Sequence, residues 1–340
     1  MAGTGDAHMR PADQAVLRGD EVVVEFPMKR GAVVQAVSGI SIDVLPGETL
    51  GLVGESGCGK STLAKSILQL PPPTGGSVSF RGKELTSLSR EELRQLRPQL
   101  QVIFQDPISS LNPRRRVRDI VAESIAIWGD EAGDADERVA KVFTDVGLDA
   151  EVVGDRYPHE FSGGQAQRIC IGRALVPDPE VLVCDEPVSA LDVSVQAQIL
   201  NLLEDMKARY GLSMLFIAHD LGVVKNISDR VAVMYLGKLC EVASPDKMYA
   251  EPAHPYTEAL IAAVPSAEKI DIDAIPKGQL PSPMNPPSGC RFRTRCPRAD
   301  QLCADEEPQM RRVAPDHFVA CHHPNEVTGD VPVPTAASAG

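Results

Sequence analysis

The sequence lacks the long apolar segments that would carry it into a membrane or out of the cell. No run of about 18 apolar residues occurs, so we expect no transmembrane helix. Residues 1–19 are small and polar, and they contain no apolar signal-peptide core. We therefore expect the protein to stay in the cytoplasm, where its eight cysteines are not expected to form structural disulfides.

An excess of basic residues is also missing. The chain has 34 lysines and arginines against 47 aspartates and glutamates, which gives a formal net charge of −13. A surface that binds nucleic acid through its phosphates needs the opposite sign, so we expect no nucleic-acid partner. No internal repeat is visible, and 340 residues suffice for one large domain with an appendage.

The most informative stretch is a glycine-rich loop that ends in a lysine. It follows the apolar run 49–53, which predicts a buried strand, and it precedes residues 63–68, which predict a helix. This order is the context of a phosphate-binding P-loop, in which Lys60 would neutralise the β- and γ-phosphates and Ser61 would offer a hydroxyl to Mg²⁺. We expect the phosphates to be held by Gly54, Glu55, Ser56, Gly57, Cys58, Gly59, Lys60, Ser61 and Thr62.

Polar side chains end three further apolar runs. They are Gln105, the pair Asp185 and Glu186, and His219. Each alone is a weak signal, because an acid pair often faces solvent at a turn and a lone histidine is more often structural. Beside a P-loop, Gln105 and Asp185 could reach Mg²⁺, Glu186 could polarise an attacking water, and His219 would join the same strand ends.

Residues 108–160 change in character and predict a helical insert in an α/β domain. Their Arg114–Arg116 run could bind an anion, although a solvated face or a partner contact is the commoner role. A second glycine-containing helix start follows, and it is also an anion-binding arrangement. Because one nucleotide rarely needs two such sites, we expect the second to serve the nucleotide of a partner subunit. Its residues are Ser162, Gly163, Gly164 and Gln165.

In this order the motifs resemble those of an ABC-transporter ATPase subunit over roughly residues 20–265. The resemblance implies that the P-loop binds ATP with Mg²⁺, that Gln105 is the Q-loop, and that 162–165 is the signature closing over the partner's ATP. It places Asp192 in the D-loop and makes His219 the switch histidine at the γ-phosphate. The adenine-stacking aromatic of the family is not obvious, and Phe26 is the candidate.

The resemblance also implies an assembly and a fold. A second ATPase subunit, either a copy or a paralogue, would pair head to tail with this one. Two membrane-spanning permease subunits and an extracytoplasmic substrate-binding protein would complete the machine. The expected fold is an α/β P-loop ABC-type ATPase core with a helical subdomain and a small C-terminal cysteine-bearing extension.

A narrower resemblance is to the oligopeptide/dipeptide permease branch. It lies in the segments 104–107, 110–113, 157–165 and 254–257, and in the tail 281–324. It implies that this subunit lies on the cytoplasmic face of the membrane and that its ATP hydrolysis powers import of di- or oligopeptides. Another small solute such as nickel remains an alternative cargo. A non-transport ABC ATPase in DNA repair or translation is disfavoured by the single cassette and the negative charge.

Four cysteines lie in the proline-rich tail: Cys290, Cys296, Cys303 and Cys321. A segment with little core of its own often needs a staple. Zinc usually prefers shorter C-x₂₋₄-C pairs, and the wider spacing fits a Cys₄ iron–sulfur cluster better. The resemblance points the same way, since some dipeptide-permease ATPases carry a [4Fe–4S] cluster in such a tail. Zn²⁺ and reduced structural thiols remain alternatives.

These features divide the chain into expected segments. We expect a disordered N-terminus over residues 1–19 and an ATPase domain over 20–265, with its helical subdomain at about 106–165. The extension with the four cysteines should cover 266–324, and residues 325–340 should form a disordered tail.

Overall fold

The computed structural model describes residues 4–128, 135–263 and 278–328. At its centre five strands run parallel in the spatial order β9-β3-β8-β7-β6. Every residue of β3, β7 and β8 is buried, as expected for a parallel sheet with both faces covered. Four of these strands correspond to the apolar runs of the sequence: β3 (Thr49–Val53), β6 (Leu100–Ile103), β7 (Val181–Asp185) and β8 (Ser213–Ala218). The fifth is β9 (Arg230–Tyr235).

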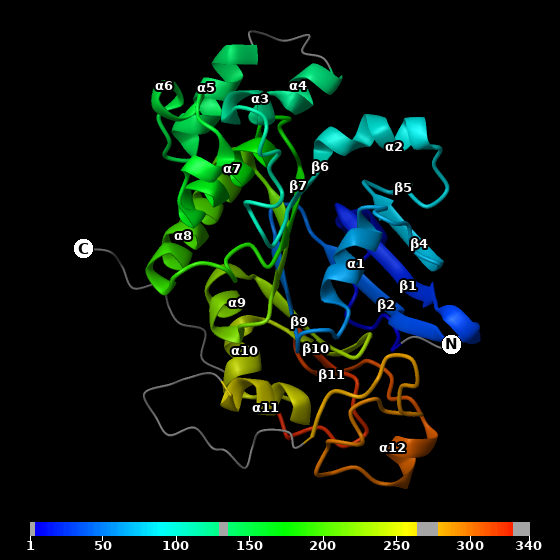
Figure 1. Cartoon of the computed structure of the whole chain (residues 1–340). Coiled ribbons are helices and arrows are strands. Elements are labelled where there is room, and N and C mark those ends of the chain that lie inside the picture. Colours follow the sequence, from blue (N-terminus) through cyan, green and yellow to red (C-terminus); the bar gives the residue numbers. More distant parts are fainter. Residues whose placement is uncertain (1–3, 129–134, 264–277, 329–340) are drawn as a thin grey trace.

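A second, antiparallel sheet lies beside the first one, in the order β2-β1-β4-β5. Helix α1 (Lys60–Ile67) packs between the two sheets and shares one apolar core with both of them (Figure 1). The strands of this sheet are β1 (Leu17–Pro27), β2 (Val33–Val44), β4 (Gly75–Phe80) and β5 (Lys83–Glu84).

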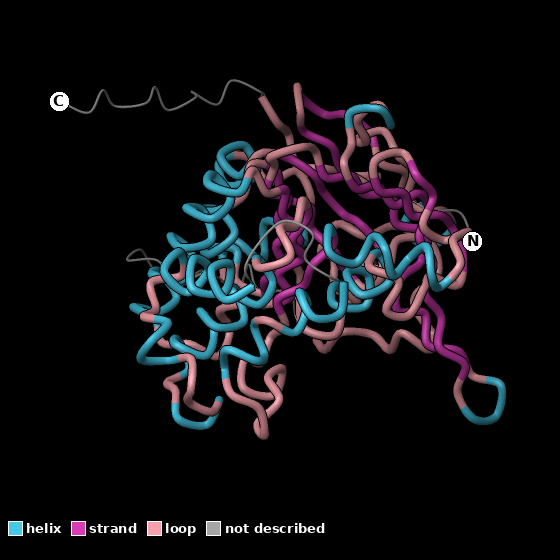
Figure 2. Tube along the Cα trace, turned by 90° about the horizontal axis from the view of Figure 1, so that it is seen from above, coloured by secondary structure: helices cyan, strands magenta, loops and turns pink. Residues whose placement is uncertain are grey.

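Helices cover the opposite face of the parallel sheet and continue into a helical region. Viewed from above, this side of the molecule is mostly helix, whereas the strands gather on the other side (Figure 2). Helix α7 contacts α3, α5, α8 and β6, so it joins the helical region to the sheet. The helices are α3 (Val117–Val121), α4 (Glu123–Trp128), α5 (Ala135–Asp145), α6 (Ala150–Val153), α7 (Gly163–Leu175) and α8 (Val193–Tyr210).

The remaining helices are α2 (Arg90–Leu96), α9 (Leu221–Ile227), α10 (Pro245–Ala250), α11 (Pro255–Ala262) and α12 (Gln301–Asp305). Of these, α9 packs against β3 and β8 of the central sheet, and α12 lies within the extension. Short 3₁₀ turns occur at Ala12–Gln14, Lys29–Gly31, Arg97–Gln99 and Pro158–Glu160. Within the described ranges, no helix combines the length and the apolar character that crossing a bilayer requires.

The extension adds two strands to the large sheet. β10 (Lys238–Ala243) pairs with β9. The sheet does not end there, because β12 (His317–Val319) pairs antiparallel with β10 and β11 (Arg311–Ala314) pairs with β12. An uncovered strand leaves a row of unpaired N–H and C=O groups, and β12 satisfies those of β10.

The N-terminus also differs from its prediction. The sequence indicated disorder over residues 1–19, but β1 already begins at Leu17. His8 is buried, and its Nε2 lies 2.9 Å from Ser41 O. A polar, aperiodic segment can therefore be ordered by a few contacts with residues far along the chain. Of the predicted C-terminal tail, residues 329–340 lie outside the described part of the chain, while Asn325 Nδ2 donates to Pro252 O at 2.7 Å.

Candidate functional site

The loop between β3 and α1 has a backbone that only glycine can follow at two positions. Gly54 has φ +154° and Gly59 has φ +109°. A Cβ on Gly54 would meet Met234 O at 2.1 Å, and one on Gly59 would meet Ala36 O at 2.2 Å. The loop is therefore pressed against its neighbours on one side, which leaves its other side to the pocket.

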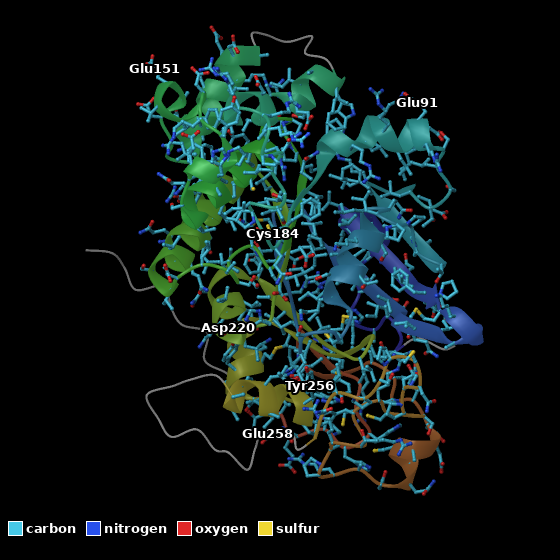
Figure 3. The ribbon with its side chains drawn as sticks, viewed as in Figure 1. Glu91, Glu151, Cys184, Asp220, Tyr256 and Glu258 are labelled. Atoms are coloured by element: carbon cyan, nitrogen blue, oxygen red, sulfur yellow. The ribbon has the colours of Figure 1, made fainter. Side chains whose placement is uncertain are left out.

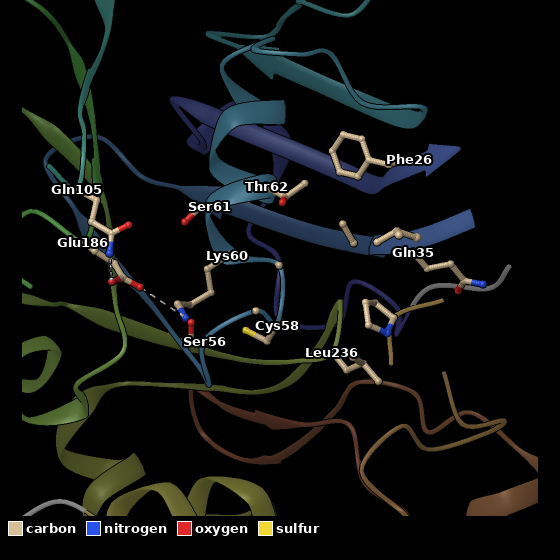
Figure 4. Close-up of a pocket in the computed structure, with 15 residues that line it drawn as sticks. Phe26, Gln35, Ser56, Cys58, Lys60, Ser61, Thr62, Gln105, Glu186 and Leu236 are labelled. Atoms are coloured by element: carbon tan, nitrogen blue, oxygen red, sulfur yellow. Dashed lines mark hydrogen bonds and ion pairs between the residues drawn. The ribbon is translucent and has the colours of Figure 1, made fainter. Parts of the chain in front are cut away.

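Lys60 lies over this loop with its charge near the pocket floor. Its side chain is only 4% exposed. Nζ donates to Gly54 O at 2.7 Å and to Glu55 O at 3.2 Å, and it stands 4.0 Å from Glu186 Oε1 (Figure 4). The buried ammonium is thus held by the loop and by the carboxylate of Glu186, which follows β7.

Ser61 and Asp185 join the start of α1 to the end of β7. Ser61 Oγ donates to Asp185 Oδ1 at 2.6 Å. A hydroxyl and a carboxylate beside phosphate-binding amides are oxygen donors of the kind that Mg²⁺ prefers. The donor set therefore fits the ion that the sequence predicted for these two residues.

Glu186 is the point at which the predicted polar residues meet. Its Oε2 accepts from Gln105 Nε2 at 3.1 Å and lies 3.3 Å from His219 Nδ1. The Glu186 backbone has φ +51°, a left-handed conformation that costs a non-glycine residue about 1–3 kcal/mol. Such strain often occurs at functional sites, where it fixes the direction of a side chain. Here it places the Glu186 carboxylate between the ends of β6, β7 and β8 and the P-loop.

A pocket of about 330 Å³ opens over the P-loop. Phe26, the candidate for the adenine-stacking aromatic, lines its outer part and is 39% exposed (Figure 4). Burial raises the pKa of the Cys58 thiol, so this loop residue stays neutral beside any bound anion. The sequence did not predict five other lining residues: Val34, Gln35, Ala36, Leu236 and Pro283.

The residues 162–165 lie away from this pocket at the start of α7. Ser162 and Gln165 cap each other, with Ser162 N to Gln165 Oε1 at 3.1 Å and Gln165 N to Ser162 Oγ at 3.4 Å. Both are exposed, and no residue of 162–165 is among those lining the pocket. Asp192 precedes α8 beside Val193, which is 82% exposed. The use of these residues by a partner subunit stays a prediction.

The four tail cysteines come together in the structure. Cys290 N donates to Cys303 O at 2.8 Å. Burial, together with the charge of the neighbouring cysteines, raises the pKa of Cys290 to about 11 and that of Cys321 to about 12. Cys296 and Cys303 are raised in the same direction, chiefly by burial. Cys303 and Cys321 are buried, Cys290 and Cys296 are partly buried, and a metal centre at these four residues stays a prediction.

A tighter group of potential ligands was not predicted. Among the described residues, Asp300, Cys303 and His323 have ligand atoms that all lie within 4.8 Å of one another. His323 Nε2 is 2.9 Å from Asp300 Oδ2. In a [4Fe–4S] cluster each cysteine binds a different iron. The four cysteine sulfurs are therefore further apart than the ligand atoms of a single metal ion. His317, the other tail histidine inside the fold, instead contacts Glu241 Oε1 at 2.6 Å.

Two further residues contact the P-loop and were not predicted as site residues. Tyr256 of α11 accepts a hydrogen bond from Glu55 N at 2.9 Å. Arg295 of the extension donates to both carboxylate oxygens of Glu55 at 2.9 Å. Both lie in segments of the narrower resemblance, 254–257 and 281–324, but no local pattern indicates that they contact Glu55.

Comparisons with known proteins agree with this geometry. The family described as ABC transporter matches residues 37–189, and the oligopeptide/dipeptide transporter C-terminal region matches residues 240–303. The chain is 47% identical over 321 residues to the oligopeptide transport ATP-binding protein AppF of Bacillus subtilis (strain 168), covering 91% of this chain and 97% of that protein. It is 50% identical over 293 residues to the oligopeptide transport ATP-binding protein OppF of Haemophilus influenzae, covering 84% and 88%.

Solved structures show the same architecture. The dimeric structure of MJ0796, a bacterial ABC transporter cassette, has a TM-score of 0.62 and 25% identity, and the match covers 67% of this chain and 98% of that one. The structure of cbiO1 from Clostridium perfringens, part of the ABC transporter complex cbiONQ, has a TM-score of 0.61 and 29% identity, covering 70% and 92%.

Proposed function

This chain belongs to the ABC transporter family, in the branch of the oligopeptide transport ATP-binding proteins, and we propose that it hydrolyses ATP to power import of di- and oligopeptides. A separate membrane-spanning permease would carry the peptide. The observation that carries the ATPase part is the convergence of Lys60, Gln105 and His219 on Glu186 beside the P-loop pocket. The peptide part is supported by the names of the relatives and by the match of the C-terminal region.

The geometry supports a division of labour among these residues. Loop amides and Lys60 hold the β- and γ-phosphates, and Glu186 orients and polarises the attacking water. His219 contacts the γ-phosphate, and Gln105 links the site to the helical region. Ser61 and Asp185 would hold Mg²⁺, which would supply positive charge to offset the negative charge that develops on the phosphates.

The subunit works within a larger assembly. The exposed Ser162–Gln165 segment faces the nucleotide of a second ATPase subunit, paired head to tail with this one. Two permease subunits and an extracytoplasmic substrate-binding protein complete the machine, which places this chain on the cytoplasmic face of the membrane.

The extension carries a metal centre at its four cysteines. A [4Fe–4S] cluster held by Cys290, Cys296, Cys303 and Cys321 accounts for four converging, partly buried thiols in a segment with little core of its own. Zn²⁺ is the alternative, and Asp300, Cys303 and His323 are its ligand set. In either case the centre acts first as a staple for the extension.

Two substitutions test the ATPase site. Glu186→Gln keeps the shape of the side chain but removes the base, so we expect kcat to fall about 10²- to 10⁴-fold while ATP binding persists. The variant should also accumulate as a closed dimer in ATP. Turnover in purified protein is the measurement, and the exposed Glu151→Gln is the matched control (Figure 3). Wild-type turnover by Glu186→Gln would remove Glu186 from the chemistry.

Peptide uptake tests the transport role. Cells that express Lys60→Ala should lose uptake of labelled di- and oligopeptides, because the phosphates lose their main charge partner. Lys65→Ala, exposed on the same helix, should transport normally. Unchanged uptake with Lys60→Ala, in cells without another peptide importer, would leave the ATPase assignment in place and show that the cargo is a different solute.

A further inference from the structure

The extension reaches the nucleotide site through one arginine, and we propose that Arg295 is a positioning residue that holds the P-loop in its ATP-binding shape through Glu55. This inference rests on the proposed ATPase function. Arg295 Nη1 donates to Glu55 Oε1 and Oε2, both at 2.9 Å. The two residues are 240 positions apart, so the contact exists only when the extension is folded onto the core.

Glu55 connects this contact to the catalytic lysine. Its amide N–H donates to Tyr256 Oη at 2.9 Å, and its carbonyl oxygen accepts from Lys60 Nζ at 3.2 Å. The side chain is held by the extension, the amide by α11, and the carbonyl by the lysine that meets the phosphates. A shift of Glu55 must therefore move a ligand of the Lys60 ammonium.

Glu55 stands behind the pocket and not in it. The loop residues that line the pocket begin at Ser56 and end at Thr62. Glu55 is thus not placed to touch the phosphates, and Arg295 lies one contact further away. Both can affect ATP only by setting the position of the loop, which distinguishes them from Lys60 and Ser61.

The Arg295 side chain is largely buried and packs against an aromatic ring. Its side chain is 8% exposed, and its guanidinium lies over the Tyr235 ring at 5.8 Å. Tyr235 packs edge-on against Tyr256 of α11 and Phe292 of the extension, with centroid distances of 4.8 and 5.2 Å. Because one partner of a largely buried ion pair cannot be removed without leaving the other uncompensated, loss of either charge should distort this junction.

A second arginine fixes the extension to the pocket wall. Arg291 is buried and donates to Leu236 O, to Gln35 Oε1 at 3.0 Å and to Ser38 Oγ at 2.9 Å. Leu236 and Gln35 both line the pocket, and Gln35 N donates to Pro283 O at 3.0 Å. The extension is therefore anchored beside the site at more than one point, and losing Arg295 alone should leave it attached.

The experiment is a double-mutant cycle on the full-length chain. Arg295→Gln should raise the KM for ATP, and the Kd measured with a fluorescent ATP analogue, by roughly tenfold, because a charge-assisted contact from Nη1 to both carboxylate oxygens of Glu55 is lost. The kcat should change less than about twofold, since Glu186, Gln105 and His219 are untouched. Arg295→Lys should recover part of the affinity as a point charge. Glu55→Gln should match Arg295→Gln, and the double variant should be no worse than either one.

Arg293→Gln is the control, because this neighbour bonds only to Ser288 of the extension in the contacts described, and its KM should stay at the wild-type value. Additive effects of the Glu55 and Arg295 substitutions, or an unchanged Kd in Arg295→Gln, would overturn the positioning role. An equal loss in Arg293→Gln would do so too, because it would indicate general damage to the extension. A wild-type chain that binds no nucleotide would instead overturn the proposed function.

Discussion

His254 is a titratable group with no access to solvent at the start of α11. Its ring Nδ1 accepts a hydrogen bond from Tyr256 N at 3.0 Å, and its backbone N–H donates to Glu241 Oε2 at 2.7 Å. Burial lowers its pKa from 6.5 to about 4, against the opposing charge of Glu241. The histidine is therefore neutral in the folded protein over a range in which the unfolded chain is protonated.

This difference makes folding acid-sensitive. Between about pH 6.5 and 4 the unfolded state binds the extra proton, so stability is present at neutral pH and is lost as the pH falls through this window, by about 3 kcal/mol when complete. His254→Asn keeps a side-chain acceptor for the helix start but has no group that titrates. Urea unfolding at pH 7.5 and 4.5 should show a smaller loss in the variant, by about 2–3 kcal/mol. If the wild type and His254→Asn lost equal unfolding free energy between pH 7.5 and 4.5, the acid sensitivity would not come from His254.

The apolar residues of the extension that the structure describes pack mostly against the ATPase core. Phe292 belongs to the core that includes α7 and α8, whereas Met310 and Phe318 belong to the core around α1. Only a small separate cluster, around Val319 and Cys321, joins the extension to itself. Backbone pairing of β12 with β10 and the buried Glu241–His317 contact add polar attachment. A staple at the cysteines is consistent with an element whose own apolar cluster is this small.

Metal analysis of this element separates the possible centres. Protein purified without oxygen should contain iron and labile sulfide in equal amounts, and Cys290→Ser should lose both because one of four ligands is gone. Cys170→Ser, at a buried cysteine of α7, should keep them. If the metal is zinc without sulfide, and His323→Ala loses it while Cys290→Ser retains it, the site is Asp300, Cys303 and His323. Absence of any metal would identify the four residues as reduced thiols.

The same elements show what a sequence can predict and what it cannot. The P-loop and the ends of β6, β7 and β8 were identifiable because each is a short contiguous pattern, and parallel strands bring their ends to one edge of the sheet. The Arg295–Glu55 contact was not identifiable, since no local pattern marks either residue as a partner of the other. The pairing of β12 with β10 and the packing of His8 were missed for the same reason: both depend on contacts between distant segments of polar, aperiodic sequence.

At the scale of the whole molecule, the two anion-binding helix starts lie apart, and the head-to-tail pair that we propose would account for this arrangement. The helix start at Lys60 opens into the pocket, while the one at Ser162 is exposed and contributes nothing to the pocket lining. The exposed Val193 near Asp192 adds an apolar side chain to the surface at the start of α8. A head-to-tail pair would place each Ser162 segment over the nucleotide of the other subunit and cover both features.

Mixing two inactive variants tests this arrangement. Lys60→Ala disables the P-loop of its own subunit, and Ser162→Arg disables the segment offered to the partner, so each homodimer should be inactive. In a mixed dimer of the two variants, the P-loop of the Ser162→Arg subunit faces the intact Ser162 of the Lys60→Ala subunit. One complete site forms, and ATP turnover should return to about half of the wild-type value if the two sites work independently. If both groups served a nucleotide within one subunit, mixing would restore nothing, and the head-to-tail model would fail. Formation of the mixed dimer must be checked by pull-down of two differently tagged variants. If the natural partner is a paralogue, the two variants would form no mixed dimer, and the Ser162→Arg chain would recover ATP turnover only when that paralogue is added.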